Sequence, residues 1–546
     1  MDTPNNITGQ LPTEIPENTT VITTKSSSPC YRYSTLKQTF NVPDIVTWND
    51  LKKALPKNVN IKRIKLAYNF ADKIHAGQKR LSGEDFIHHP LAVAYLIAKL
   101  ELDEDSIVAA LLHDVLEDNT IGIKSNIIKK YFGETVTFLV ESLTNIRNVT
   151  PRFIGNQDSI PDLRKLLFAA AKDIRVIILR LSDKVHNAWT AYSLPEDKKI
   201  RLAKRALTIY APLAHFVGLT MYRRELEESA FQILYPTTHD WLSTEMSYLY
   251  SLNIKSIINP IERILPKNMN IRITARRKSL WSTYQKILKY LERQNRLNET
   301  LSLPLSRRLG IYSETLNTIY DKLGVMILTD TTSNVYRILE LLHNNFEYLP
   351  EQFDDYIKNP KKNGYRGIHT VIKIPQKELS KKHKRDVFAE VQIKTYKMHE
   401  FNEYGPASHI AYKWATENDS DYLWIKELVK WTKNKKRYRL KLFDNFVLVL
   451  TPQGEIIRLE KGATVIDLFY KLRKEAFPYL VKALVNDKEV PFDYVLKTGD
   501  IVSYVIDPLG QIPHKDLAKY AAFKETKNYI KKNLKESVMV GRISIL

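Results

Sequence analysis

Apolar residues recur at three- and four-residue spacing through the first part of the chain, from Val46 to about Leu219. One run with this spacing is Ile64, Ala67, Phe70 and Ile74. Because a helix turns once every 3.6 residues, such positions share one face and can be buried together. Glycines are sparse in this region. The pattern predicts a mainly helical domain at residues 46–219.

A different pattern begins near residue 220, where helical segments alternate with strand-like runs. These runs are 323–328, 368–374 and 387–394. Within the last run, apolar residues separate three polar ones, Glu390, Gln392 and Lys394. Successive side chains of a strand point to opposite faces, so the three polar side chains share one face. We interpret this face as part of a site, and residues 220–415 as a mixed α/β domain.

A small β-rich module is predicted at residues 442–507. Two short apolar runs flank a turn at Pro452–Gly454, which is a hairpin signal. Thr464, with Asp467 three residues later, is typical of a helix start. Asn486 and Asp487 mark a further turn before a closing strand. The order of strand, strand, helix, strand and strand resembles a β-grasp fold.

Three further segments lie outside these domains. Residues 1–45 begin with a stretch rich in Thr, Asn, Ser and Pro, which predicts a disordered arm. Residues 416–441 are basic and aromatic and are expected to form a helical linker. Residues 508–546 are expected to form a short helical tail.

Composition narrows the partners and the compartment. The 546 residues include 83 Lys and Arg against 61 Asp and Glu, a net charge of +22 that favours polyanionic partners. A single cysteine, Cys30, excludes an intrachain disulfide and a thiolate zinc site. No apolar run of 18 residues and no secretion signal occur. We therefore expect a cytoplasmic protein without a membrane partner.

The most informative segment is an apolar run that carries four ionisable residues within six positions, His113, Asp114, Glu117 and Asp118. We interpret the run as a helix, on which residues four apart share a face, so His113 pairs with Glu117 and Asp114 with Asp118. Burying such groups is costly unless a partner compensates, and a divalent cation would do so. Imidazole and carboxylate ligands suit manganese, iron or zinc. The alternative for each residue alone is a capped helix with surface charges, and the set together disfavours it.

A second set of residues is suited to phosphate chemistry. Arginines and lysines crowd residues 272–286 and can clamp a triphosphate, although a solvated basic face is the alternative. Asp321 is expected to begin one strand, and Glu390 lies on the polar face of another. Two carboxylates beside a basic clamp suit a magnesium ion and a general base. Tyr365, between glycines, can stack on a base.

Three motifs carry a family resemblance in the helical domain: Arg80-Leu-Ser-Gly-Glu-Asp-Phe-Ile-His-His-Pro90, His113-Asp-Val-Leu-Glu-Asp118 and residues 173–187. They resemble the HD phosphohydrolase superfamily, specifically the hydrolase domain of the long RelA/SpoT homologues. The resemblance implies that Mn²⁺ is held by His89, His113, Asp114 and Asp183. It further implies that Glu117 and Asp118 orient and deprotonate the attacking water, and that Arg80 and Asn187 contact the nucleotide.

The second domain carries Asn363-Gly-Tyr365, His369-Thr370 and Glu390-Val-Gln-Ile-Lys-Thr395, with Ala407–Lys413 closing the set. These motifs resemble the synthetase domain of the same family, which has a nucleotidyltransferase-like fold. The resemblance implies that Asp321 binds Mg²⁺ and that Glu390 activates the 3′-hydroxyl of GDP or GTP. The implied ATP-binding residues are Arg276, Lys278, Ser282 and Lys286. The implied guanine nucleotide-binding residues are Lys361, Asn363, Tyr365 and His369.

The β-grasp module resembles the TGS domain, which in the family senses deacylated tRNA at the ribosome. Thr451–Gly454, Gly462–Asp467 and Lys497–Asp500 carry this resemblance. Two residues depart from the family pattern. Met326 stands where the family usually has arginine, five residues after the magnesium aspartate, and Arg473 stands where it usually has histidine.

The expectation is a multidomain α and β protein with an all-α HD hydrolase domain, an α/β synthetase domain and a β-grasp TGS domain. It would hydrolyse (p)ppGpp, and would synthesise it from ATP and GDP or GTP. One alternative is a hydrolase whose synthetase is impaired at Met326. Another is a non-catalytic nucleotide or tRNA sensor, which the intact metal set disfavours.

Overall fold

The computed structural model describes residues 35–117, 122–147, 166–167, 169–170, 172–217, 219–361, 365–379, 385–399, 446–452, 456–506 and 514–532. The predicted linker at 416–441, Asp118 and Asn363 lie outside these residues, as do residues 1–34. The prediction of a disordered arm is corrected for its last part, because residues Thr35–Phe40 form helix α1. The buried side chains of Leu36 and Phe40 anchor this helix. Within the described chain, no helix has the length and apolar character needed to cross a bilayer.

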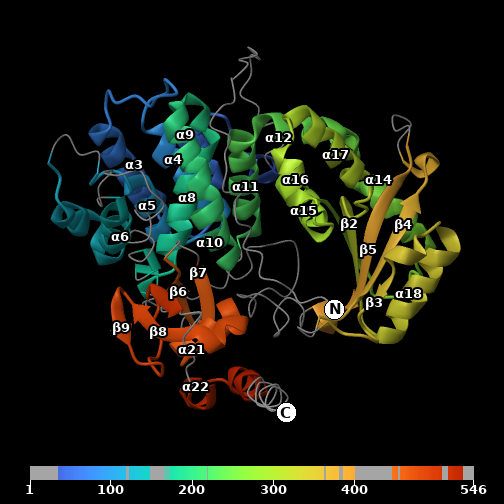
Figure 1. Ribbon diagram of the computed structural model, residues 1–546. Coiled ribbons are helices and arrows are strands. Elements are labelled where there is room, and N and C mark those ends of the chain that lie inside the picture. The colour runs from blue at the N-terminus through green and yellow to red at the C-terminus, as the bar shows by residue number, and fades with distance from the viewer. Residues whose placement is uncertain are drawn as a thin grey trace. The chain divides into compact units, whose positions relative to one another are not determined.

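The N-terminal region is helical, as the spacing of apolar residues predicted. Its helices are α2 (Trp48–Ala54), α3 (Ile61–Ile74), α4 (His88–Lys99), α5 (Glu104–Leu112), α6 (Ser125–Arg147), α8 (Arg175–Trp189), α9 (Glu196–Arg205), α10 (Ala211–Phe216) and α11 (Thr220–Leu234), with a π-helical turn at Ala206–Tyr210. α4 and α5 pack against each other, and α4 also packs against α8 (Figure 1). All but the two end residues of α4 are buried. These three helices therefore form an interior in which buried ionisable side chains are shielded from water.

The next region combines helices with a mixed sheet. Its helices are α12 (Pro236–Glu245), α13 (Ser247–Ser251), α14 (Ile254–Ile264), α15 (Leu280–Arg293), α16 (Leu297–Ser302), α17 (Leu305–Asn317) and α18 (Thr332–Asn345). Its strands are β1 (Arg272–Arg277), β2 (Leu323–Thr329), β3 (Asp354–Asp355), β4 (Ile368–Ile374) and β5 (Val387–Thr395), in the sheet order β1-β2-β5-β4-β3. Only β2 and β5 pair in parallel. The three predicted strands are confirmed. Each of them buries most of its apolar residues, which is the pattern from which it was predicted.

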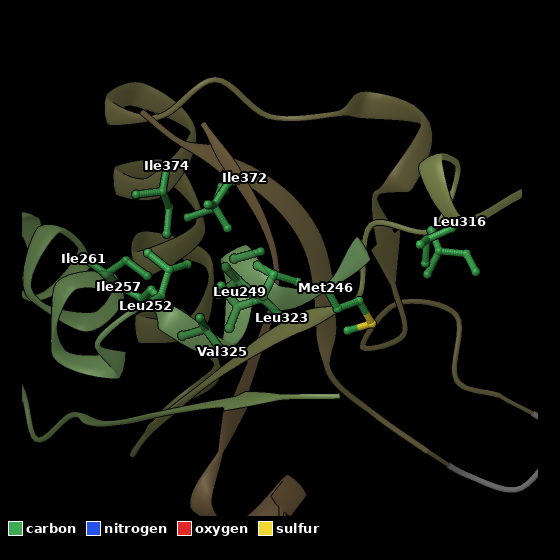
Figure 2. Close-up of a cluster of buried hydrophobic side chains, with 14 of the residues drawn as sticks. Met246, Leu249, Leu252, Ile257, Ile261, Leu316, Leu323, Val325, Ile372 and Ile374 are labelled. Atoms are coloured by element: carbon green, nitrogen blue, oxygen red, sulfur yellow. The ribbon is translucent and has the colours of Figure 1, made fainter. Parts of the chain in front are cut away.

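The two faces of this sheet differ in chemistry. One face is apolar: Val325 and Ile327 of β2 and Ile372 and Ile374 of β4 pack against helices that include α14 and α18 (Figure 2). The opposite face carries the polar residues of β5. Across it, Glu390 is in register with Gly324 and Arg276. Consequently, one sheet face supplies a core and the other a platform for charged groups.

Asp321 does not begin a strand, which corrects the expectation from the sequence. It lies in a turn two residues before β2. The backbone N–H of Lys278 donates to the carbonyl of Lys322 at 2.9 Å, so this turn is tied to the segment between β1 and α15. The turn therefore brings Asp321 close to the basic segment.

The C-terminal module follows the predicted order of elements, with one additional short strand, β9 (Lys488–Val490), after the helix. They are β6 (Phe446–Leu450), β7 (Ile456–Glu460), α21 (Val465–Arg473), β8 (Leu480–Val485), β9 (Lys488–Val490), β10 (Val502–Ile506) and α22 (His514–Tyr520). Asp467 accepts hydrogen bonds from the backbone N–H and the hydroxyl of Thr464, both at 2.9 Å, which is the predicted capping arrangement. Asn486 and Asp487 adopt φ of 54° and 64° in the turn between β8 and β9. Asn and Asp tolerate this left-handed conformation best among residues with a side chain.

Helix α11 contributes to two packed regions at once. In its first half, the Tyr222 hydroxyl lies 3.2 Å from the hydroxyl of Ser182 on α8. In its second half, Glu228 accepts a hydrogen bond of 2.8 Å from the backbone N–H of Trp281, at the start of α15. Phe231 stacks on Tyr284 of α15 with ring centroids 5.0 Å apart. The helix is thus held along most of its length.

The carboxyl of Glu228 makes the stability of the fold depend on pH. Burial raises its pKa to about 7, although the Trp281 N–H and Ser279 act in the opposite direction. Between the ordinary pKa of glutamic acid and this value, the folded chain keeps a proton that the unfolded chain has lost. The free energy of unfolding therefore falls as pH rises through this interval, by up to about 3 kcal/mol.

We predict that Glu228→Gln flattens this pH dependence, since the amide keeps the acceptor oxygen and does not titrate. Urea midpoints measured near about pH 5 and about pH 7.5 would differ less in the variant than in the wild type. Glu292→Gln is the matched control, because Glu292 is an exposed residue of α15. Equal pH dependence in the wild type and the Glu228 variant would contradict the prediction.

Candidate functional site

Three buried helical segments bring the predicted metal ligands together. His89 lies in the first turn of α4, His113 and Asp114 directly follow α5, and Asp183 lies on α8. His89 Nε2 is 3.4 Å from Asp114 Oδ2 and 3.5 Å from Asp183 Oδ1. His113 Nε2 is 3.2 Å from the same Asp114 oxygen. All four side chains are almost completely buried.

One part of the sequence interpretation of this centre is corrected. α5 ends at Leu112, so His113 to Glu117 do not continue the helix and do not pair on its faces. Instead the backbone turns tightly, with the N–H of Glu117 donating to the carbonyl of Asp114 at 3.0 Å. The turn is what allows His113 and Asp114, adjacent in sequence, to point to one centre. Glu117 is half-buried beyond it, and Asp118 lies outside the described residues.

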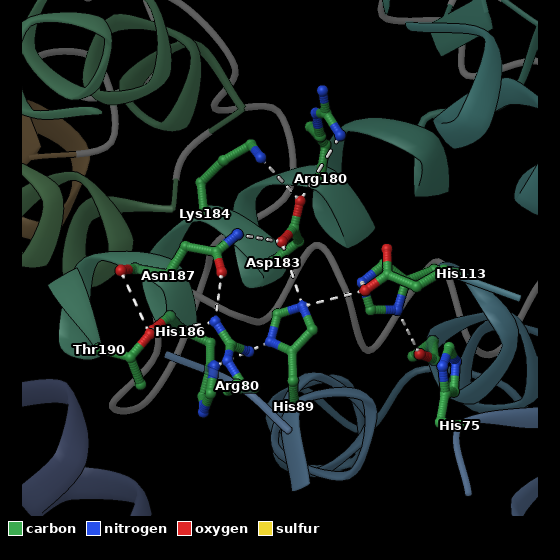
Figure 3. A network of polar contacts seen from close by, with 12 residues as sticks. His75, Arg80, His89, His113, Arg180, Asp183, Lys184, His186, Asn187 and Thr190 are labelled. Carbon is green, nitrogen blue, oxygen red and sulfur yellow. Dashed lines mark hydrogen bonds and ion pairs between the residues drawn. The ribbon is translucent and has the colours of Figure 1, made fainter. Parts of the chain in front are cut away.

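Cations and an amide surround Asp183 (Figure 3). Its carboxylate lies 3.0 Å from Lys184 Nζ and 3.5 Å from Arg180 Nη1, and it accepts a hydrogen bond of 2.5 Å from the Asn187 amide. Arg80 Nη2 in turn donates to Asn187 Oδ1 at 3.0 Å. The predicted nucleotide contacts Arg80 and Asn187 are thus bonded to each other beside the centre.

The protonation states of the histidines at this centre are suited to metal binding. Burial lowers the pKa of His89 to about 4, although Asp183 opposes this shift. Burial also lowers the pKa of His186, whose Nδ1 lies 2.9 Å from His89 Nδ1. Both imidazoles are therefore neutral near neutral pH, the form that coordinates metal ions.

The donor set also fits a metal in its geometry. His113 Nε2 is buried and makes no hydrogen bond within the described part of the chain. Ligand atoms of His89, His113 and Asp114 lie within 4.8 Å of one another. A buried nitrogen without a partner is costly, and a cation between these atoms would satisfy it.

A second site forms where α15 begins. Lys278 and Lys286 place their ammonium groups 2.5 Å and 2.6 Å from Asp321 Oδ2. The other oxygen, Asp321 Oδ1, is buried without a hydrogen-bond partner among the described residues. Ser282 lies in the first turn of α15, where Ser279 caps the helix at 3.2 Å. The start of a helix attracts anions, so this cluster is suited to a polyphosphate with a metal ion at Asp321.

Glu390 lies on the polar face of the sheet, and each of its two carboxylate oxygens has a partner. His369 Nδ1 is 3.3 Å from one of its oxygens, and the Gln392 amide donates to the other at 3.0 Å. Burial acts to raise the pKa of Glu390, but His369, Gln392 and Lys286 outweigh it and hold the pKa at about 2. The carboxylate is thus ionised and oriented.

The predicted guanine site is an aromatic group beside Glu390. The Tyr365 hydroxyl lies 2.6 Å from His369 Nε2, and the two rings meet edge to face. Lys361 Nζ lies 5.4 Å from the ring centroid of Tyr365. Three of the four predicted residues are therefore brought together, while Asn363 lies outside the described residues. Arg276 of β1 is in register with the strand position beside Glu390.

Several contributing residues were not assigned from the sequence. His186 contacts His89, and Ser279 caps α15. Gln392 and Lys394 were recognised only as the polar face of β5. The alternation of that strand was the available signal, whereas the His186 contact depends on packing between α4 and α8.

Comparison with known protein families matches three models in the order of the regions described above. An HD domain matches residues 67–220, a region found in RelA / SpoT proteins matches residues 275–417, and a TGS domain matches residues 447–506. The HD match and the buried His–Asp cluster together point to the use of a divalent metal.

Curated relatives match most of the chain. A guanosine-3′,5′-bis(diphosphate) 3′-pyrophosphohydrolase of Aquifex aeolicus is 34% identical over 505 residues, covering 89% of this chain and 67% of its own. A GTP pyrophosphokinase of Streptomyces coelicolor is 30% identical, with coverages of 89% and 57%. One of Myxococcus xanthus is 32% identical, with coverages of 88% and 62%. The chain thus spans between 57% and 67% of the length of these relatives.

Among solved structures, a small alarmone synthetase 1 of Bacillus subtilis bound to its product pppGpp covers 37% of this chain and 87% of its own at 18% identity. Its TM-score of 0.22 is too low to carry an argument. The family models and curated relatives define a multidomain chain with HD, synthetase-type and TGS regions. The chain belongs to the RelA/SpoT family.

We predict that Asp114→Ala weakens divalent metal binding by more than about 100-fold. Even the loss of a residue that only hydrogen-bonds a metal ligand lowers metal affinity by about 10- to 100-fold. Metal content after dialysis, measured by inductively coupled plasma mass spectrometry, checks this. Asp197→Ala is the matched control, since Asp197 is an exposed carboxylate of α9. Full metal content in the Asp114 variant would show that this centre is not the metal site.

Proposed function

We propose that the protein is bifunctional in (p)ppGpp metabolism. It hydrolyses (p)ppGpp to GDP or GTP and pyrophosphate at the His–Asp centre, and it transfers pyrophosphate from ATP to the 3′-hydroxyl of GDP or GTP at the sheet. The observation that carries the proposal is the presence of two separate polar constellations in one chain, each suited to one reaction. The activities for which the relatives are named, those of a pyrophosphohydrolase and of GTP pyrophosphokinases, support it.

In the hydrolase site, His89, His113, Asp114 and Asp183 would hold Mn²⁺. The metal, when bound, lowers the pKa of a coordinated water and offsets the charge of the leaving pyrophosphate. Glu117 and Asp118 would orient that water and take its proton. Arg80 and Asn187, already bonded to each other at 3.0 Å, would contact the nucleotide.

In the synthetase site, Arg276, Lys278, Ser282 and Lys286 would bind the triphosphate of ATP, and Asp321 would hold Mg²⁺. Lys278 and Lys286, which form ion pairs with Asp321 in this structure, would instead pair with the phosphates when the Asp321 carboxylate holds a metal ion. Glu390 would accept the proton of the ribose hydroxyl, and Tyr365 would stack on guanine, with Lys361, Asn363 and His369 near it. Phosphoryl chemistry of this kind depends mainly on positioning and charge.

The cellular setting completes the proposal. We place the reaction in the cytoplasm, and we propose deacylated tRNA and the ribosome as further partners of the TGS region. Arg473, at the end of α21, would meet a phosphate there.

Paired assays test the bifunctional proposal. Purified wild-type protein is given ATP with GDP or GTP and magnesium in one assay, and guanosine tetraphosphate with manganese in the other. We expect Glu390→Gln to lower synthesis by about 10²- to 10⁴-fold and to leave hydrolysis unchanged. Asp114→Ala is expected to do the converse. A variant that abolishes both activities, or a wild type with neither, would contradict the proposal.

A specific observation bears on the hydrolase-only alternative. Met326 lies on the polar sheet face, in register with Thr274 on one side and Gln392 on the other. A thioether at this position offers no charge to a phosphate. We predict that Met326→Arg raises the synthesis rate severalfold in an active synthetase, with Met326→Leu as the uncharged control. Synthesis that appears only in the arginine variant would favour the hydrolase-only alternative.

A further inference from the structure

Lys394 is a buried lysine beside the proposed guanine site. It lies on the polar face of β5, yet only 4% of its surface is exposed. Lysine is rarely buried to this extent, because desolvating an ammonium group is costly. Lys394 Nζ donates to Gln392 Oε1 at 3.0 Å and lies 4.9 Å from the ring centroid of Tyr365. The ammonium group therefore contacts both the proposed base-stacking ring and the polar row of β5.

The hydrogen bond from Lys394 determines which way the Gln392 amide points. An ammonium group has only N–H to give, so the amide must present its oxygen to Lys394 and its NH₂ group to the other side. That NH₂ group donates to Glu390 Oε2 at 3.0 Å. Without the lysine, either end of the amide could face Glu390, and its oxygen would repel the carboxylate. Lys394 thus orients Glu390 through one intervening residue.

The stem of Lys394 is fixed by a glycine. A Cβ placed on Gly367 would lie 3.0 Å from Lys394 Cγ and 3.2 Å from Cε, closer than ordinary van der Waals contact. A side chain at position 367 would therefore push the lysine stem away from its present path. The absence of a side chain at Gly367 gives Lys394 the space to reach Tyr365 and Gln392 together.

We propose that Lys394 is a positioning residue for synthesis, which sets Tyr365 and Glu390 in a fixed relation so that a stacked guanine nucleotide presents its 3′-hydroxyl to the carboxylate. This inference rests on the proposed synthetase function and deepens it. A second path also joins the ring to the carboxylate, since Tyr365 contacts His369 and His369 contacts Glu390. Lys394 closes these contacts into a ring of interactions around the proposed reacting hydroxyl.

The test separates kcat from KM in synthesis assays of the full chain. Lys394→Met keeps the length of the stem and removes the ammonium group, and we expect kcat to fall about 10- to 100-fold, as for a small misplacement of reacting groups. KM for ATP should stay unchanged, because the ATP clamp is centred on Asp321. Lys394→Arg keeps a cationic donor and should recover most of the rate. Guanosine tetraphosphate hydrolysis by the same preparations shows that each variant is folded.

Two further variants sharpen the test. Gly367→Ala changes no polar side chain and should also lower kcat, because its Cβ displaces the lysine stem and a side chain strains the backbone at a φ of 157°. Lys394→Met combined with Gln392→Leu should cost little more than the worse single change, since both act on Glu390 through one path. Additive losses would overturn the inference, as would an unchanged kcat in Lys394→Met. A raised KM for GDP with unchanged kcat would instead indicate direct contact with the nucleotide and would also overturn it.

The outcomes also distinguish this inference from the proposal beneath it. A wild-type chain without synthesis overturns both the proposed synthetase function and the role of Lys394. An active wild type that loses synthesis in Glu390→Gln but not in Lys394→Met keeps the function and overturns the positioning role alone.

Discussion

The cost of holding ionisable groups away from water is the constraint on which this structure depends. His89, Asp114 and Asp183 are each almost completely buried, and they come from three different segments: helix α4, the turn after α5, and helix α8. Such groups can be kept inside only if each meets a partner. Some partners lie on another helix, as His89 does for Asp183, and others lie on the same helix, as Lys184 does for Asp183. The packing of α4, α5 and α8 therefore buries these groups and also brings partners from different segments within reach.

The sheet meets the same constraint by a different route. A strand alternates its faces, so β5 can bury Val391 in the core while Glu390 remains on the opposite face. There each carboxylate is held by nearby donors: Glu390 by His369 of the neighbouring strand and by Gln392 of its own strand, and Asp321 by Lys278 and by Lys286 of α15. Periodicity alone thus separates core from site in the sheet, whereas the helical region needs turns and helix ends to place its polar groups.

This difference explains what could be predicted from the sequence. The strand at 368–374 and the polar face of 387–394 follow directly from alternation, and both are confirmed. The helix expected to continue through His113 and Glu117 stops at Leu112 and gives way to a turn, in which Asp114 contacts His89, 25 positions earlier in the chain. The position of the Lys394 side chain depends on the space left by Gly367, which has no side chain and lies 27 positions earlier in the chain. No local pattern connects those two residues.

Helix α11 has a consequence for how the chain can be divided. Tyr222 is fully buried and meets Ser182, while Phe231 belongs to the core that contains the sheet. A fragment that ended at residue 219 would leave the hydroxyl of Ser182 without its phenolic partner, and one that began there would carry Tyr222 as an exposed ring. The family domains match on both sides of this helix, but the helix itself belongs to neither alone. Excised halves would need to share it, as overlapping rather than adjoining pieces.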